Sequence, residues 1–181
     1  MSEEVQLTGA RAADLEVADG RKAIIYGGIT GSLVALDQLT KYIAQRTLPP
    51  YEPVPVIGEF FRLTYIYNPG AAFGLHVGPF SRYVFLALTV VCVIVLYVWF
   101  RGTPASDRLR LVAISLVTAG AVGNFIDRVR SSLGVIDFFD FGLGDLRWPV
   151  FNIADIGVTV GAILLAISLW REDRAAHGDE G

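Results

Sequence analysis

Four stretches of this 181-residue chain are apolar for long enough to cross a lipid bilayer as helices. The hydrocarbon core of a bilayer is roughly 30 Å thick, and a helix needs about 20 residues to span it. The composition agrees, because only 18% of the residues are charged, against about 25% in ordinary soluble chains. We therefore expect an all-α membrane protein with a four-helix bundle and spans at residues 23–42, 83–100, 109–126 and 153–170.

The basic residues are distributed unevenly about these spans. Seven Lys and Arg residues lie in three short flanking segments, residues 21–22, 101–110 and 171–174. The two long loops on the other side, residues 43–82 and 127–152, carry six basic residues over a much greater length. Because positively charged flanks are retained on the cytoplasmic side, we expect both termini in the cytoplasm and both long loops outside.

Polar segments flank the apolar region at both ends. Residues 1–22 carry five acids in their first twenty positions and show no apolar period, which predicts a disordered cytoplasmic tail. Residues 171–181 are also polar and are expected to form a second cytoplasmic tail. The functional domain is then residues 23–170, and its first apolar stretch stays as an anchor because it is too long for a cleaved signal peptide.

Small residues recur at four-residue spacing within the spans. Such spacing lets helix backbones approach closely in lipid, where packing rather than water exclusion drives association. It predicts a compact bundle, although glycine is also simply common in membrane helices. The pairs are Gly27 with Gly31, Gly28 with Ser32, and Gly157 with Gly161, and the third span adds Gly120 and Gly123.

The two long loops are richer in aromatic and β-branched residues than plain linkers. Residues 60–67 have the composition of a strand, and the second loop, VIDFFDFGLGDLRWPVFNI, is similar. Aromatic rings are favoured at the membrane interface. The loops therefore predict either a small β-rich periplasmic or extracytoplasmic cap, or a belt of aromatic residues without a common structure.

Composition argues against several classes of function. A net charge of −3 gives no concentrated basic face for nucleic acid. The single cysteine, Cys92, cannot form an internal disulfide and lies mid-span without a nearby base. His76 and His177 are far apart in the sequence and offer no zinc cluster. We therefore expect no nucleic-acid partner and no metal or other cofactor.

Five carboxylates fall between Asp127 and Asp155, around the second long loop. Acids within an apolar sequence beside a membrane are costly, so a functional role is the default hypothesis. Asp127 is followed directly by Arg128, for which a local ion pair is the plainer interpretation. Asp140 and Asp145 lie among glycine and phenylalanine residues and fit solvated turn positions.

Two of these acids, Asp137 and Asp155, are harder to explain structurally. Asp137 lies in an apolar VIDFF context without an adjacent base, and Asp155 follows Asn152 by three residues in the first turn of the fourth span. A helix N-terminus stabilises an acid there, which is the structural alternative to catalysis. Two neighbouring carboxylates share a proton and can hydrolyse a peptide bond with water alone.

The first span ends in polar residues. Asp37 and Lys41 lie four residues apart with the acid first, which is the favourable order for an ion pair within a helix. A structural salt bridge is therefore the plainer interpretation of this pair.

Four segments, in order along the chain, resemble the motifs of the lipoprotein signal peptidase family, the type II signal peptidases of bacteria. They are DQLTK at 37–41, NPGAAFG at 68–74, GNFIDR at 123–128 with VIDF at 135–138, and FNIAD at 151–155. The expected layout of four spans with both termini inside also matches that family. The resemblance implies an enzyme that removes signal peptides from diacylglyceryl-modified prolipoproteins by cutting before the lipidated cysteine.

The resemblance also implies roles for individual residues. The VIDF-type and FNIAD-type aspartates form the catalytic pair of that family, which corresponds to Asp137 and Asp155 here. Asp127 matches a supporting acid. The residues that match the substrate site are Asn68, Gly70, Asn124, Arg128, Asn152, Asp37 and Lys41.

The resulting expectation is a monomeric aspartic endopeptidase in the bacterial cytoplasmic (inner) membrane, in contact with membrane lipid and with its active site at the outer leaflet. Two other classes remain open. One is a small transporter or channel subunit whose intramembrane acids bind a cation, and the other is a non-enzymatic assembly factor. A transporter would need Asp37, Asp127 and Asp155 at mid-membrane, whereas the sequence places each near the outer end of a span.

Overall fold

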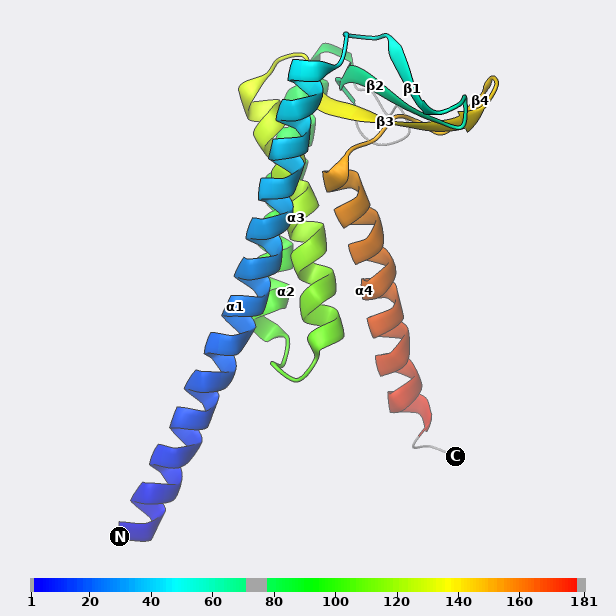
Figure 1. Cartoon of the computed structure of the whole chain (residues 1–181). Helices are drawn as coiled ribbons and strands as arrows, with labels where there is room; N and C mark the ends of the chain where they lie inside the picture. The colour runs from blue at the N-terminus through cyan, green and yellow to red at the C-terminus, as the bar shows by residue number, and fades with distance from the viewer. Residues whose placement is uncertain (1, 71–77, 179–181) are drawn as a thin grey trace.

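The computed structural model describes residues 2–70 and 78–178, and shows long helices with a small sheet at one end (Figure 1). The helices are α1 (Ser2–Thr47), α2 (Ser81–Gly102), α3 (Arg108–Arg130) and α4 (Ile153–Gly178), with a 3-10 turn η2 (Gly78–Phe80) before α2. The strands are β1 (Pro53–Ile57), β2 (Phe61–Asn68), β3 (Val135–Leu143) and β4 (Leu146–Arg147).

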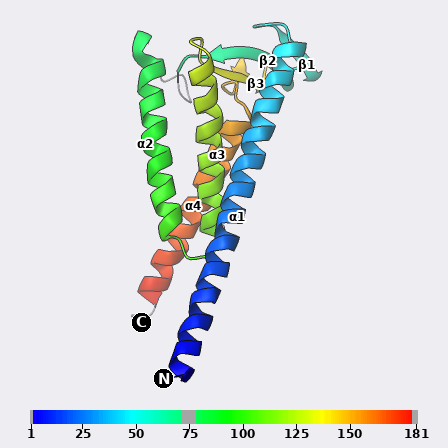
Figure 2. The same cartoon turned by 90° about the vertical axis from the view of Figure 1, so that its left-hand side faces the viewer.

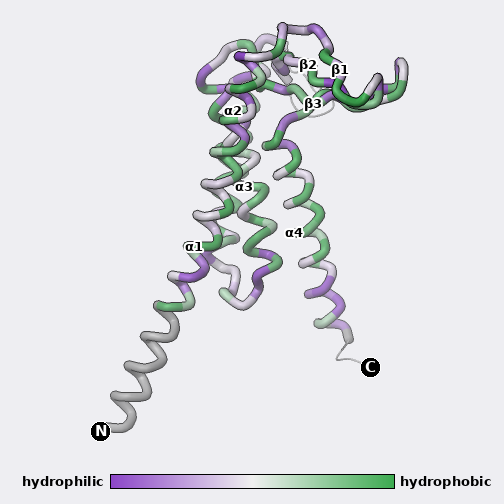
Figure 3. The backbone as a smooth tube through the Cα atoms, in the orientation of Figure 1, coloured by the Kyte–Doolittle hydropathy of each residue, from purple (hydrophilic) through white to green (hydrophobic). Residues whose placement is uncertain are grey.

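Three helical segments in the described part of the chain are long and apolar enough to cross a membrane: Gly78–Gly102, Arg108–Arg130 and Ile153–Ala175. They coincide with the last three expected spans, and Figure 3 shows apolar residues along α2, α3 and α4. The expected count of four spans is not confirmed. The stretch at residues 23–42 lies inside the 46-residue α1, where Asp37, Gln38 and Lys41 interrupt its apolar character.

Both polar ends of the chain continue as helix, which differs from the expected tails. α1 begins at Ser2, because residues 2–22 contain no proline and several strong helix formers. α4 continues to Gly178. Its last turns are supported by the Arg174 guanidinium, 4.1 Å from the Trp170 ring centroid, and by Asp173 and His177 one turn apart.

α3 is the central helix, and α1, α2 and α4 each pack against it (Figure 2). Small residues permit the closest approach, as predicted. A Cβ on Gly120 would collide with the backbone oxygen of Ala154, and one on Gly161 would lie 2.7 Å from Val117 Cγ2. Gly157 leaves room for Leu33 of α1 in the same way. The glycines of α3 and α4 therefore set the spacing of the bundle.

The small residues of α1 do not follow this pattern. An added Cβ at Gly27, Gly28 or Gly31 would meet nothing within 4 Å. The prediction that these residues pack against another helix is therefore wrong, because the face of α1 that contacts α3 is a different one.

The sheet joins the two long loops. Its strands are antiparallel in the order β1-β2-β3-β4, and β2 and β3 come from different loops. Their register places Asn68 opposite Val135 and Ile66 opposite Asp137. Beneath the sheet, Tyr65 and Phe138 pack with Ala44 of α1 in a common core. The expected β-rich cap is therefore present, and an aromatic belt without a common structure is excluded.

We predict that Gly120→Ala lowers the stability of the protein by about 1–3 kcal/mol, the usual cost of overpacking. The added methyl group would collide with Ala154 O and Val158 and push α3 and α4 apart. The thermal unfolding midpoint of purified protein in detergent measures the effect. Gly31→Ala is the matched control, because its methyl group meets nothing within 4 Å. An equal loss in both variants would contradict the prediction.

Candidate active site

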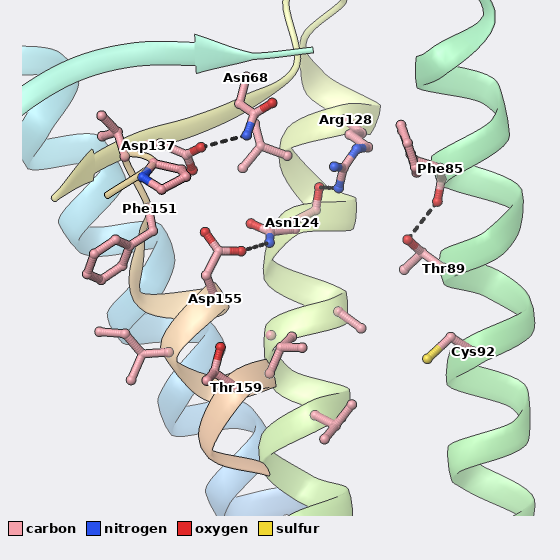
Figure 4. Close-up of a pocket in the computed structure, with 18 of the residues that line it drawn as sticks. Asn68, Phe85, Thr89, Cys92, Asn124, Arg128, Asp137, Phe151, Asp155 and Thr159 are labelled. Atoms are coloured by element: carbon pink, nitrogen blue, oxygen red, sulfur yellow. Dashed lines mark hydrogen bonds between the residues drawn. The ribbon is translucent and has the colours of Figure 1, made fainter. Parts of the chain in front are cut away.

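A cavity of about 570 Å³ lies between α2, α3 and α4 on the side of the sheet (Figure 4). Its walls along the helices are mostly apolar and include Leu88, Val117 and Val158. Its polar lining residues gather near the strands, as Figure 4 shows. They include Asn68, Asn124, Arg128, Asp137 and Asp155. The cavity suits a ligand whose apolar part lies between helices and whose polar part meets these side chains.

Asp137 is delivered to this cavity by β3. Its side chain is 1% exposed, so its polar atoms need partners within the protein. Oδ1 accepts a hydrogen bond from Asn152 Nδ2 at 2.6 Å, and Oδ2 accepts one from Asn68 Nδ2 at 2.9 Å. The pairing of β2 with β3 therefore brings Asn68 and Asp137 together from distant parts of the chain.

Asp155 lies in the first turn of α4 and is partly buried. Its Oδ2 accepts a hydrogen bond from the Asn152 backbone N–H, and Asn152 Oδ1 accepts one from the Asp155 backbone N–H. This reciprocal cap is the helix-terminus arrangement that the sequence offered as the alternative to catalysis. Oδ1 also accepts from Asn124 Nδ2 at 2.8 Å, and the carboxyl group lines the cavity. Asp155 is therefore both a cap and a cavity residue.

The two carboxyl groups are close enough to influence each other. The pKa of Asp137 is raised from 3.8 to about 7, chiefly by burial and also by the charge of Asp155. Hydrogen bonds from Asn68 and Asn152 and the charge of Lys41 act in the opposite direction. No hydrogen bond joins the two carboxyl groups in the described structure, and Asn152 contacts both. Asp137 can therefore hold or release a proton near neutral pH.

Lys41 lies behind the cavity and is 2% exposed. Its Nζ forms ion pairs with Asp37 Oδ2 at 2.9 Å and Asp127 Oδ2 at 2.8 Å. The predicted Asp37–Lys41 salt bridge is therefore confirmed. The predicted pair of Asp127 with Arg128 is wrong, because consecutive residues of a helix point in different directions. α3 continues to Arg130, so both residues are helical and Asp127 faces α1.

The residues expected to line a substrate site fall into two groups. Asn68, Asn124 and Arg128 line the cavity together with the two aspartates. The other four contact this group or the helix that carries it. Asp37 Oδ1 accepts a hydrogen bond from the Ala154 backbone N–H at the start of α4, and Gly70 O accepts one from Arg128. Asn152 donates to both aspartates, and Lys41 donates to Asn124.

Arg128 brings a positive charge to the polar end of the cavity. Its guanidinium donates to the backbone oxygens of Gly70 and Asn124 and lies 5.4 Å from the ring centroid of Phe85. Its buried Nε has no hydrogen-bond partner, and no acid of the described chain forms an ion pair with it. The guanidinium therefore retains donor capacity for a ligand.

The sequence predicted Asp140 at a solvated turn, but the residue lies buried in β3. It is 3% exposed and accepts hydrogen bonds from Arg147, Thr64 and Arg62. Burial alone would raise the pKa of Asp140, but these hydrogen bonds lower it overall. Asp140 therefore stabilises the sheet as an anion, whereas Asp145 is exposed in the turn between β3 and β4.

Sequence reasoning missed two parts of the cavity lining. One is residues 148–150, which precede the FNIAD motif, and the other is the face of α2 that carries Phe85, Thr89 and Cys92. Only general apolar character marks these residues in the sequence, so no local signal identified them. His76, considered as a metal ligand, lies outside the described residues.

The cavity thus lies between helices that are long and apolar enough to span a membrane, and two carboxyl groups line its polar end. The sequence model of the signal peptidase (SPase) II family matches residues 29–171. The chain belongs to this family. It is therefore a peptidase, and its three apolar helices are those of a multi-pass membrane protein.

Relatives and solved structures agree. The lipoprotein signal peptidase of Geobacter metallireducens is 41% identical over 157 residues, which cover 86% of this chain and 96% of that protein. The one from Geobacter sulfurreducens is 44% identical and covers 81% and 91%. A solved structure described as a bacterial membrane enzyme, determined by the in meso method at 2.3 Å, has a TM-score of 0.73 at 37% identity and covers 82% and 88%. These comparisons give the transporter alternative no support.

We predict that the stability of Asp137→Asn relative to the wild type rises with pH. Because the folded pKa of Asp137 is raised, its stability contribution is full below about pH 4 and is lost as pH rises through about 7. An uncharged asparagine has no such pH dependence, although its NH₂ group meets a donor from Asn68 or Asn152 at every pH. The difference between the thermal unfolding midpoints of variant and wild type should therefore shift in favour of the variant between pH 4 and pH 8. Asp145→Asn is the control at an exposed site, and a difference independent of pH would refute the assignment.

Proposed function

We propose that this chain is an aspartic endopeptidase that removes signal peptides from diacylglyceryl-modified prolipoproteins by cutting before the lipidated cysteine. The observation that carries the proposal is that Asp137 and Asp155 face one cavity whose walls are apolar and whose polar end lies at the sheet (Figure 4). The relatives named lipoprotein signal peptidase support the substrate class.

The environments of the two aspartates suggest separate roles. Asp137, with its raised pKa, holds the proton and polarises the scissile carbonyl. Both oxygens of Asp155 accept N–H donors, as those of Asp137 do, but Asp155 also lies at the positive end of α4, which stabilises its carboxylate form against the cost of burial. Asp155 takes a proton from water as the water oxygen attacks the carbonyl carbon, and Asp137 protonates the carbonyl oxygen. Collapse of the tetrahedral intermediate breaks the C–N bond, the amine takes the proton from Asp155, and Asp137 regains its own.

The cavity fits a substrate that carries both lipid and peptide. α2 and α4 each pack on α3, and the described residues show no extensive contact between α2 and α4. Acyl chains can therefore enter from the bilayer between these helices and contact Leu88 and Val158. The guanidinium of Arg128 and the amide of Asn124 lie where they can donate to peptide carbonyl oxygens.

We also propose that α1 forms the fourth span. Its polar residues Asp37 and Lys41 are buried against α3, so they do not face lipid. The start of α1 and the last turns of α4 lie at the end opposite the sheet (Figure 1). Lys22 of α1 donates to the backbone oxygen of Arg101 at the end of α2, and Arg171 lies in the last part of α4. The positive-inside rule then places the termini in the cytoplasm and the carboxyl pair at the outer leaflet of the cytoplasmic membrane. The proposal is of a monomer whose reaction uses water and no cofactor.

We predict that Asp137→Asn and Asp155→Asn each reduce cleavage of a lipidated precursor peptide by about 10²–10⁴-fold, the usual contribution of a general acid or base. The assay uses purified protein reconstituted in lipid, and thermal unfolding confirms that each variant is folded. Asp145→Asn removes one carboxyl from the exposed β3–β4 turn and should cleave like the wild type. Substantial cleavage by either of the first two variants would refute the catalytic pair.

A further inference from the structure

The side chain of Lys41 is enclosed by three oxygen atoms. Asp37 Oδ2, Asp127 Oδ2 and Asn124 Oδ1 lie 2.9, 2.8 and 3.0 Å from its Nζ. An ammonium group has three N–H donors and no acceptor. All of its donors are therefore used, and each neighbouring atom must be an acceptor.

This chemistry determines the orientation of the Asn124 amide. Because Lys41 can only donate, the carbonyl oxygen of Asn124 must face it, and the amide NH₂ must point the other way. The NH₂ group then donates to Asp155 Oδ1 at 2.8 Å. A reversed amide would place NH₂ against the ammonium group and a carbonyl oxygen against the carboxylate, which loses both hydrogen bonds.

The other two asparagines around the carboxyl pair are fixed differently. Asn152 Oδ1 accepts from the backbone N–H of Asp155, and Asn68 Oδ1 accepts from the backbone N–H of Gly70. Each is oriented by a backbone donor two or three residues away in its own segment. Asn124 Oδ1 instead accepts from two side chains, Lys41 Nζ at 3.0 Å and Asn152 Nδ2 at 3.1 Å. Lys41 is the charged one of these two donors, and it lies on another helix, 83 positions away in the sequence.

We propose that Lys41 is a positioning residue for the reaction, which holds the Asn124 carbonyl so that the Asn124 amide donates to Asp155 and keeps this carboxylate ready to accept the proton of water. The proposal rests on the proposed peptidase function. The charged groups that act on Asp155 are Lys41 and Asp37 of α1, Arg128 of α3 and Asp137 of β3. A purely structural role for Lys41, as the counter-ion of Asp37 and Asp127, is the alternative to be separated.

The test compares two variants in the lipidated-peptide assay. Lys41→Met alone leaves two buried carboxylates unpaired, which is strongly destabilising. Lys41→Met/Asp127→Asn removes one charge of each sign, and Asp127→Asn alone serves as its reference because the Lys41–Asn124 hydrogen bond is retained. We expect the double variant to show about a tenfold to hundredfold lower kcat than the reference with little change in KM, the loss expected for a hydrogen bond to a charged group.

The pH profile separates positioning from structural support. Without its donor, the Asp155 carboxylate holds a proton more tightly, so the acidic limb of the kcat profile should move to higher pH. The charge of Lys41 lowers the pKa of Asp137, so the double variant should also show its alkaline limb at higher pH. Merely reduced stability would lower the thermal midpoint and leave the acidic limb unchanged. Equal kcat and equal acidic limbs in the double variant and its reference would overturn the proposal.

Asn124→Ala is a second variant, and it keeps Lys41 paired with both Asp37 and Asp127. If the double variant does not fold, this variant tests whether the Asn124 amide positions Asp155. It should show the same fall in kcat and the same shift of the acidic limb, and unchanged values would overturn the proposal. Because Lys41 acts through Asn124, its removal in the Asn124→Ala/Asp127→Asn background should cost little more. If the losses in kcat from removing Lys41 and from removing Asn124 add in full, the positioning proposal is also overturned. Failure of the wild type to cleave, or cleavage by Asp155→Asn, would instead refute the proposed function itself.

Discussion

A buried ammonium group, that of Lys41, ties three helices together at the sheet end of the bundle. It forms ion pairs with Asp37 on its own helix and with Asp127 on α3. Asp37 in turn accepts a hydrogen bond from the backbone N–H of Ala154, in the first turn of α4. Removing charges from water is costly unless each is paired and hydrogen-bonded. The helices can therefore meet in few arrangements other than this one, and the glycines of α3 and α4 allow the close contact that it requires.

The carboxyl pair depends on this arrangement from two sides. Asn124 and Asn152 connect Asp155 to the Lys41 cluster and to Asp137, while β2 supplies Asn68 from the sheet. Every oxygen of the two carboxyl groups thus accepts a hydrogen bond from a nitrogen whose orientation is determined by its neighbours. A low-dielectric site of this kind strengthens each of these interactions, and it raises the cost of any donor left without a partner.

The depth of the cavity follows from the same constraints. The first turn of α4 and the first residues of β3 meet at the boundary between apolar helices and the sheet, so the carboxyl pair lies at the end of the α4 span and not at its middle. In the proposed function, a lipid-bearing substrate that fills the apolar walls brings its polar portion to the carboxyl groups. Lipid recognition and the position of cleavage would then be one geometric property of the bundle.

Hydropathy and local motifs were sufficient to predict α2, α3 and the start of α4 within a few residues, the strand character of the long loops, and Asp137 and Asp155 as the carboxyl pair of interest, because each of these features depends on a short run of residues. The end of α4 was predicted at residue 170, but the helix continues through the polar segment to Gly178. The partner of Asp127, the burial of Asp140 and the exposure of Gly31 were predicted wrongly, because each depends on which face of an element meets another. The hydrogen bond between Asp37 and Ala154 joins residues 117 positions apart. Only the folded chain determines such contacts, since periodicity specifies which residues share a face and not which face they meet.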